Sequence, residues 1–367
     1  MSLTRGTVYF THSIFFFSDS CYNAYINNPF SNLFLNTLTM ELFMIERFSV
    51  YSSCTLCHHR CGVDRTSGKL GRCRVPADLY IARAALHYWE EPCISGDCGS
   101  GTVFFSGCNL GCVFCQNHSI AKADIGRKVS VARLSEIFLE LQTKGAANIN
   151  LVTPTHYVPS IAEALKMAKT DGLTIPIVYN TGGYESVETL RLLDGLVDIY
   201  LPDFKYMDTR LSARYSHAPD YPEVAKAALA EMYRQVGDPK FLEPPANLDR
   251  ETSDATLSAD RDDEPNSLMK KGIIVRHLAL PGCEDDSRAV LRYLYETYGD
   301  HIYISIMNQY TPLPHVAAYP ELNRRITDEE YDRLTDYAVD LGIENGFIQE
   351  GETAEESFIP EFDYEGV

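Results

Sequence analysis

Three cysteines, Cys108, Cys112 and Cys115, stand on one short segment with the spacing Cys-x3-Cys-x2-Cys. Thiolates this close together can hold three of the four irons of a cubane cluster. The fourth iron then has no protein ligand and can accept an external chelate, as the open position of a catalytic zinc site accepts a substrate. The amino and carboxylate groups of S-adenosylmethionine suit that iron, and one electron from the cluster can cleave the sulfonium to methionine and a 5′-deoxyadenosyl radical. The spacing therefore predicts a [4Fe–4S] cluster that works with S-adenosylmethionine.

The same spacing also fits a structural zinc site, or a cluster that is closed by a fourth cysteine such as Cys93 or Cys98. The position of the loop favours the open cluster, because it follows a short apolar run at 102–106 directly. Cofactors sit at the carboxyl ends of barrel strands. Phe114, beside the last cysteine, is expected to offer a surface for adenine or, alternatively, to pack in the core.

A second set of cysteines, here called the upstream cysteine group, has the spacing Cys54-x2-Cys57-x3-Cys61-x11-Cys73. Four thiolates within twenty residues suit structural zinc or a second iron–sulfur cluster, either structural or redox-active. Unligated thiols are a third interpretation. Disulfides are the weakest interpretation if the compartment is reducing.

The composition limits the choice of partners. The chain has 32 basic and 51 acidic side chains, a formal charge of −19. Such a surface repels phosphate backbones and anionic lipid heads. We therefore expect no nucleic-acid partner and no membrane partner. We also expect a cytoplasmic location.

Composition also divides the chain. Residues 1–43 carry a single charge between Arg5 and Glu41, and we expect a dispensable extension there, with translation starting at Met40 or Met44. A targeting segment and a structured arm are the alternatives. The other expected parts are a cysteine-rich segment at 44–99, a barrel at 100–349 with a flexible acidic insertion at 237–271, and an acidic tail at 350–367.

Apolar runs and helical periodicity alternate from residue 100 onward. Strands are expected at 102–106, 148–152, 175–179, 197–201, 273–280, 302–307 and 346–349. Helices are expected at 134–144, 161–168, 187–193, 224–236, 287–298 and 328–341. Strands separated by single helices indicate parallel βαβ units. Six or seven such units in a row predict an α/β fold with a barrel or part-barrel.

The cysteine loop with its aromatic residue is similar to the signature of the radical S-adenosylmethionine (radical SAM) superfamily. The wider sequence, from about Cys54 to the C-terminus, resembles the uncharacterised pyruvate formate-lyase-activase-like group, the PflX type. The segments that carry the resemblance begin at Trp89, Asn150, Tyr200 and Met307 and read WEEPCISG, NLVTPTHY, YLPDFKY and MNQYTP. The resemblance implies a partial (β/α)6 barrel.

The resemblance also implies residues for binding S-adenosylmethionine. Activases carry Gly-Gly-Glu after the second strand for the methionine amino group, whereas this chain has Thr153, Pro154, Thr155 and His156 there, so either threonine or the histidine could replace that ligand. The segment Asn180-Thr-Gly182-Gly-Tyr resembles the activase Asn-Gly segment near the ribose and carboxylate, and an ordinary βα turn is the alternative.

Arg276 follows from the same resemblance, and the remaining candidates follow from their places at strand ends or on the cysteine loop. Arg276 could pair with the methionine carboxylate or form an internal salt bridge. Asp203 and Lys205 end the fourth expected strand, where they could contact S-adenosylmethionine or substrate, or pair with each other. Asn117 closes the cysteine loop and is expected at the cofactor. Candidates for substrate contact end the sixth strand: Asn308, Gln309 and Tyr310.

These features predict a radical SAM oxidoreductase that abstracts hydrogen from an unidentified substrate. Activation of a protein substrate by making a glycyl radical is the leading subclass, on family analogy alone. A radical enzyme acting on a small metabolite is the second hypothesis. A non-catalytic iron–sulfur or zinc protein for electron transfer or binding is the third. The expected electron donor is a one-electron carrier such as flavodoxin or ferredoxin.

Overall fold

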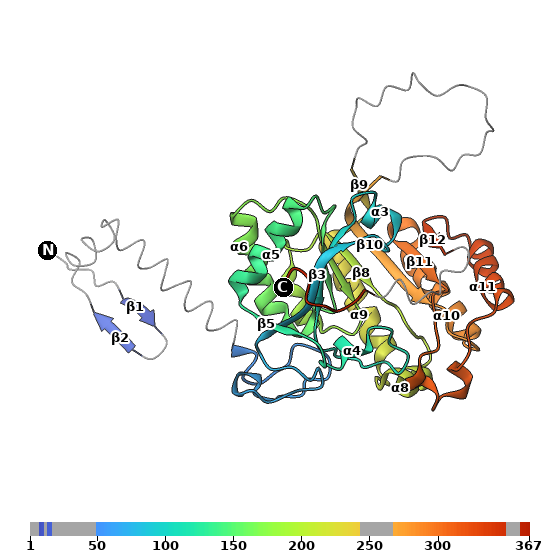
Figure 1. The fold of residues 1–367 in the computed structure, drawn as a ribbon, viewed down its shortest axis with the longest axis horizontal. Coiled ribbons are helices and arrows are strands. Elements are labelled where there is room, and N and C mark those ends of the chain that lie inside the picture. The colour runs from blue at the N-terminus through green and yellow to red at the C-terminus, as the bar shows by residue number, and fades with distance from the viewer. Residues whose placement is uncertain (1–6, 11–12, 17–48, 243–266, 350–359) are drawn as a thin grey trace, which may run out of the picture. The chain divides into compact units, whose positions relative to one another are not determined.

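The computed structural model describes residues 7–10, 13–16, 49–242, 267–349 and 360–367 (Figure 1). The chain divides into two units, Met1–Val50 and Tyr51–Val367. In the first unit, β1 (Thr7–Phe10) and β2 (Ser13–Phe16) pair antiparallel. The predicted start sites, most of the acidic insertion and the first part of the acidic tail lie outside the described residues.

The second unit is built on a sheet whose parallel strands follow one another in chain order (Figure 1). Each strand pairs with the next one along the chain, with helical segments in the connections. The predicted α/β fold is confirmed, because single crossovers between neighbouring parallel strands are what the alternating pattern required. The strands are β4 (Ser100–Phe105), β6 (Ile149–Val152), β7 (Ile177–Thr181), β8 (Ile199–Pro202), β10 (Met269–Leu278), β11 (Tyr303–Met307) and β12 (Gly346–Ile348).

The longer helices each bury an apolar face in the core. In α5 the buried side chains recur at helical spacing, among them Leu134, Phe138 and Leu141. Thr327 caps α11 in a capping box with Glu330, and the helix begins at the expected residue, Asp328. The helices are α5 (Val131–Thr143), α6 (Val158–Thr170), α7 (Val187–Leu190), α8 (Thr209–Ser216), α9 (Tyr221–Val236), α10 (Glu284–Tyr298) and α11 (Asp328–Leu341).

In the second unit, three antiparallel strands and three helices had not been expected. They are β3 (Leu79–His87), β5 (Arg127–Val129), β9 (Lys240–Phe241), α3 (Pro92–Ser95), α4 (His118–Ala121) and α8. β3 reads LYIARAALH, and its three alanines favour a helix on propensity alone. It is a strand because it pairs with β4 on one side and β5 on the other. Tertiary pairing therefore overrides local preference here.

The C-terminal segment 360–367 lies along β3. The backbone N–H of Tyr364 donates to the carbonyl of Ala82 at 3.0 Å, and the N–H of Ala84 donates to the carbonyl of Glu365 at 2.8 Å. Arg83 forms an ion pair with Asp363 at 2.7 Å. No helix among the described residues is long and apolar enough to cross a membrane.

Candidate active site

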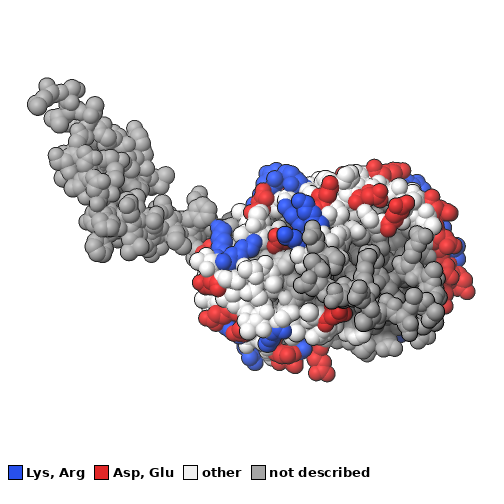
Figure 2. Space-filling view, turned by 90° about the horizontal axis from the view of Figure 1, so that it is seen from above, with Lys and Arg blue, Asp and Glu red and all other residues white. Residues whose placement is uncertain are grey.

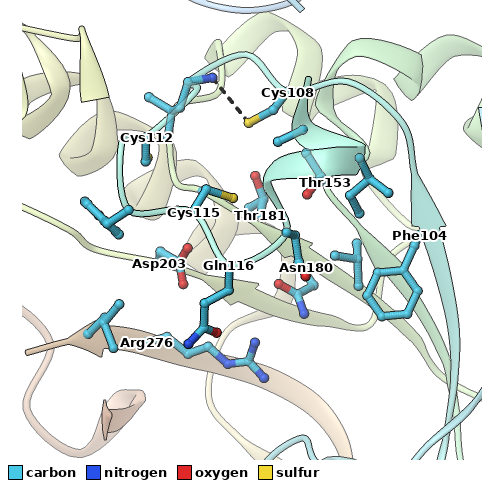
Figure 3. Close-up of a pocket in the computed structure, with 18 of the residues that line it drawn as sticks. Phe104, Cys108, Cys112, Cys115, Gln116, Thr153, Asn180, Thr181, Asp203 and Arg276 are labelled. Atoms are coloured by element: carbon cyan, nitrogen blue, oxygen red, sulfur yellow. Dashed lines mark hydrogen bonds between the residues drawn. The ribbon is translucent and has the colours of Figure 1, made fainter. Parts of the chain in front are cut away.

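The three cysteines of the Cys-x3-Cys-x2-Cys motif lie on the loop that follows β4, here called the cluster loop (107–117). Gly107 starts the loop with φ +91°, and a Cβ at this position would lie 2.6 Å from the carbonyl oxygen of Cys73. Only glycine fits such a close approach in the left-handed region. The loop therefore turns sharply off the strand and carries its thiols over the carboxyl ends of the parallel strands (Figure 3).

The thiols face a cavity of about 250 Å³, here called the inner cavity. Its other polar walls come from the ends of the strands that follow β4, so residues far apart in sequence meet there (Figure 3). The parallel strands β4, β6, β7, β8, β10 and β11 each contribute a residue at the strand end or directly after it. The residues expected from the sequence that line it are Cys108, Cys112, Phe114, Cys115, Asn117, Thr153, Asn180, Gly182, Asp203, Lys205, Arg276 and Gln309.

The protonated thiols are costly to ionise in this environment. Burial raises the pKa of all three thiols, Cys108, Cys112 and Cys115. For Cys108 and Cys115 the neighbouring cysteines raise the pKa further. Two groups already stabilise negative sulfur: the Leu110 N–H donates to Cys108 Sγ at 3.4 Å, and the Ser216 hydroxyl donates to Cys112 Sγ at 2.9 Å. A bound metal replaces the thiol protons and removes the cost of ionisation.

The donor set fits a cubane with one open iron. Three soft sulfur donors stand on one loop, and a cavity opens beside them where an external ligand can enter. Among the described residues, no group of three or more His, Cys, Asp or Glu side chains could hold a metal ion by itself. This holds for the cluster loop too, as expected where each thiol binds a different iron.

Asp203 and Lys205 follow β8 and form an ion pair at the cavity wall, with Nζ and Oδ2 2.5 Å apart. Burial alone would lower the pKa of Lys205, but the Asp203 carboxylate and the nearby cysteines hold it above its ordinary value. The ammonium therefore stays charged beside the thiols. It can offset negative charge on the cluster loop.

Arg276 crosses the cavity from β10 and is already paired. Its guanidinium binds the Glu91 carboxylate in a bidentate manner, at 2.7 and 2.8 Å, and also contacts Glu90. Asn150 donates to Glu90 at 2.8 Å. The sequence analysis quoted both glutamates within the WEEP segment but gave them no role. The ion pair to Arg276 is visible only once β3 and β10 are placed.

Thr155 and His156 do not line the inner cavity. The His156 Nε2–H donates to the Ser106 carbonyl at 2.8 Å, and burial, with help from Arg65, lowers the pKa of the imidazole to about 3. Thr155 donates to Glu185 at 2.8 Å. Burial raises the pKa of Glu185 to about 7, and its Oε2 has no hydrogen-bond partner. These residues hold the ends of β4, β6 and β7 together.

Thr153 does face the inner cavity, and its backbone has φ +59°. A β-branched residue in the left-handed region costs of order 1–3 kcal/mol, and such strain clusters at functional sites. Its N–H donates to the carbonyl of Asn180 at 2.9 Å, which joins the ends of β6 and β7. Gly182 lies so close to the cluster loop that a Cβ there would meet Leu110 at 2.8 Å.

The upstream cysteine group packs against the cluster loop. Cys54, Cys57 and Cys73 are buried, whereas Cys61 is exposed. The His59 Nε2–H donates to the Asn109 carbonyl at 2.8 Å, one residue from Cys108. Since no group of described side chains could hold a metal ion by itself, this geometry gives no support to a single zinc ion, and metal binding there stays a prediction.

Comparison with known proteins agrees with this site. Residues 102–236 match the family model of the Radical SAM superfamily. The Methanocaldococcus jannaschii protein named Uncharacterized protein MJ0674 is 27% identical over 301 residues, which are 79% of this chain and 75% of that protein.

Two solved structures show weaker similarity. Streptococcus suis SuiB bound to S-adenosylmethionine is 15% identical with a TM-score of 0.43, over 66% of this chain and 48% of SuiB, so this chain spans about half of SuiB. A domain of pyruvate-formate lyase-activating enzyme from Bacteroides vulgatus is 12% identical with a TM-score of 0.34, over 53% of this chain and 92% of that domain. The family match covers the cluster loop and the strands β4 to β8, so this part of the chain is similar to the Radical SAM superfamily, and the similarity supports S-adenosylmethionine-dependent radical chemistry.

Proposed function

We propose that this protein is an enzyme that binds a [4Fe–4S] cluster at Cys108, Cys112 and Cys115 and abstracts hydrogen from its substrate. One observation carries the proposal: three thiols on one loop open onto a cavity that is lined by the polar ends of the parallel strands. When bound, the cluster and S-adenosylmethionine supply the one-electron cleavage that gives methionine and a 5′-deoxyadenosyl radical. The chain supplies binding, orientation and exclusion of water.

Individual side chains divide these tasks. Asn180 has both a donor and an acceptor at the end of β7 and can orient a polar cofactor group. Lys205 keeps a positive charge beside the thiols. Phe114, Leu278 and Met307 give the cavity apolar walls. Arg276 is neutralised by two glutamates, so we assign it to the shape of the cavity rather than to a free carboxylate.

The decisive experiment is anaerobic reconstitution with iron and sulfide, followed by dithionite and S-adenosylmethionine. We expect 5′-deoxyadenosine and methionine in equal amounts. Cys115→Ala should abolish both, and Cys98→Ala is the matched control because Cys98 is exposed and does not line the cavity. A fully loaded cluster that yields no 5′-deoxyadenosine would indicate an electron-transfer or binding protein instead.

The substrate has two candidates. Activation of a glycyl radical enzyme rests on the resemblance to activases. A small metabolite is favoured by the size of the inner cavity, because about 250 Å³ falls below the usual 300–1,000 Å³ of ligand pockets and must also admit S-adenosylmethionine. An activase would produce a glycyl-radical EPR doublet in the partner protein, whereas a small-molecule enzyme would move substrate deuterium into 5′-deoxyadenosine.

We also propose a metal centre, a second iron–sulfur cluster or zinc, at the upstream cysteine group. Support comes from Arg65, which is 1% exposed. Its guanidinium donates to the carbonyls of Val75, Pro76 and His156, and lies 3.7 Å from Cys54 Sγ. No described carboxylate pairs with it. A buried cation needs a nearby anion, and metal-bound thiolates would provide one.

A cytoplasmic location also stays a prediction.

A further inference from the structure

The cluster loop has a second cavity on its other side, here called the outer cavity, of about 120 Å³. It shares Cys108, Cys112 and Cys115 with the inner cavity, so the same thiols are reached from two directions. The remaining lining is basic, and none of the described residues that line it is acidic. The basic side chains, here called the basic rim, are Arg72, Arg74, His118, Lys122 and His217.

The cations of the basic rim are not used in ion pairs. Arg72 donates to the carbonyl of Leu110 at 3.1 Å, and within the described part of the chain neither it, Arg74 nor Lys122 has a carboxylate within 4.0 Å. All three are exposed. Elsewhere most arginines are paired, such as Arg234 with Asp194 at 2.7 Å. Acidic and basic side chains lie beside one another at several places on the face drawn in Figure 2.

Unpaired cations around the thiols are unusual in a chain with a formal charge of −19. The surface as a whole repels an acidic protein, but physiological salt screens exposed charges that lie more than about 8–10 Å apart. An acidic partner therefore meets attraction only where cations are locally in excess. Such complementarity steers a partner to one orientation and raises its association rate.

We propose that the basic rim is the docking surface for an acidic one-electron carrier protein that reduces the cluster from the outer side. This proposal rests on the proposed function, which consumes one electron for each S-adenosylmethionine cleaved. In the transfer, the carrier is oxidised by one electron and the cluster is reduced by one, and no bond is made or broken. Substrate and S-adenosylmethionine keep the inner cavity, so the carrier and the reactants do not compete for space.

The test compares two double variants that change the charge equally. Arg74→Glu with Lys122→Glu reverses the basic rim and leaves Arg72, which bonds to the cluster loop, in place. Lys144→Glu with Lys270→Glu is the control, because both lysines are exposed and stand at the opposite end of the sheet, beside the first residues of β6 and β10. The probe is reduced flavodoxin, with a neutral photoreduced deazaflavin as the small reductant.

We expect the rim variant to reduce its cluster at least about tenfold more slowly with flavodoxin at low salt, and at the wild-type rate with deazaflavin. The control variant should match the wild type with both reductants. Added salt should slow flavodoxin with the wild type and hardly affect the rim variant. Equal rates of cluster reduction by flavodoxin in the two variants would overturn the proposal. Slower reduction of the rim variant by deazaflavin as well would also overturn it, because the two cations would then affect the cluster itself rather than docking.

A second measurement separates this proposal from the proposed function. Flavodoxin binding to the chain is titrated without S-adenosylmethionine, with and without a reconstituted cluster. Salt-sensitive binding that the rim variant loses supports the docking surface even if no 5′-deoxyadenosine forms. Inorganic phosphate at matched ionic strength should compete no better than chloride. Specific displacement by phosphate would show a small-anion site and overturn the protein partner.

Discussion

Replacing Arg276 tests whether this side chain is structural or is free for a cofactor. Its side chain is 14% exposed, and those of its partners Glu90 and Glu91 are 7% and 6% exposed. Removing one member of a buried ion pair leaves the other charge uncompensated and costs about 3–5 kcal/mol. Arg276→Ala would leave two buried carboxylates without their cation, so we expect it to lower the free energy of unfolding by an amount in that range.

The decrease in the free energy of unfolding caused by Arg276→Ala should depend on pH. In the wild type, burial raises the pKa of Glu91, but Arg276 outweighs burial and holds it below its ordinary value. The pair therefore contributes stability above the unfolded pKa of about 4.3, and that stability is lost as the pH falls through the folded pKa. Without Arg276, burial alone acts, so the pKa of Glu91 rises above the unfolded value and protonation relieves the penalty. The difference between the two proteins should be largest at pH 7 and smaller near pH 4.

The assay is urea unfolding of the cluster-free chain, followed by circular dichroism at several pH values. Lys128→Ala is the control, because Lys128 is 61% exposed, Asp78 is 49% exposed, and such a surface pair should contribute little to stability. A loss below about 1 kcal/mol in Arg276→Ala, independent of pH and joined to weaker S-adenosylmethionine binding, would refute the structural role. That result would favour the other predicted role, in which Arg276 binds the methionine carboxylate of S-adenosylmethionine.

Three further outcomes are expected. With all three cysteines of the cluster loop replaced by Ala, anaerobic reconstitution should still leave about one zinc or roughly four irons per chain at the upstream cysteine group, and a metal-free chain would contradict a second centre. His156→Gln should make the free energy of unfolding less dependent on pH between about pH 6.5 and 3. The low pKa of His156 keeps the imidazole neutral in the folded chain, whereas in the unfolded chain it takes up a proton over this range and so favours unfolding. An unchanged dependence on pH in urea unfolding would exclude this cause. Deletion of residues 1–43 should leave a soluble chain that still forms 5′-deoxyadenosine, whereas insolubility beside a soluble full-length control would indicate a structured arm.

The sequence alone was enough to predict the α/β class and the order of its strands. Hydrophobic periodicity is a local signal, and it placed α11 correctly from Asp328 to Leu341. The cysteine spacing predicted the cluster loop for a similar reason, because ligands that must share one small cluster stand close together in the chain. The resemblance to activases then indicated Asn180, and the rule that strand ends carry cofactors indicated Asp203 and Lys205. All three line the inner cavity.

Only the tertiary structure decided which polar residues near those ends face the cavity. Thr153 does and His156 does not, although they are three residues apart, because the left-handed backbone at Thr153 begins a turn that buries the histidine against Ser106. The strand β3 depends on its pairing with β4 and β5, and the ion pair of Glu91 with Arg276 joins residues 185 positions apart in the chain. No periodicity within one segment encodes such contacts. The basic rim has the same origin, since Arg72 and Arg74 meet Lys122 and His217 only where the folded chain brings them around the cysteines.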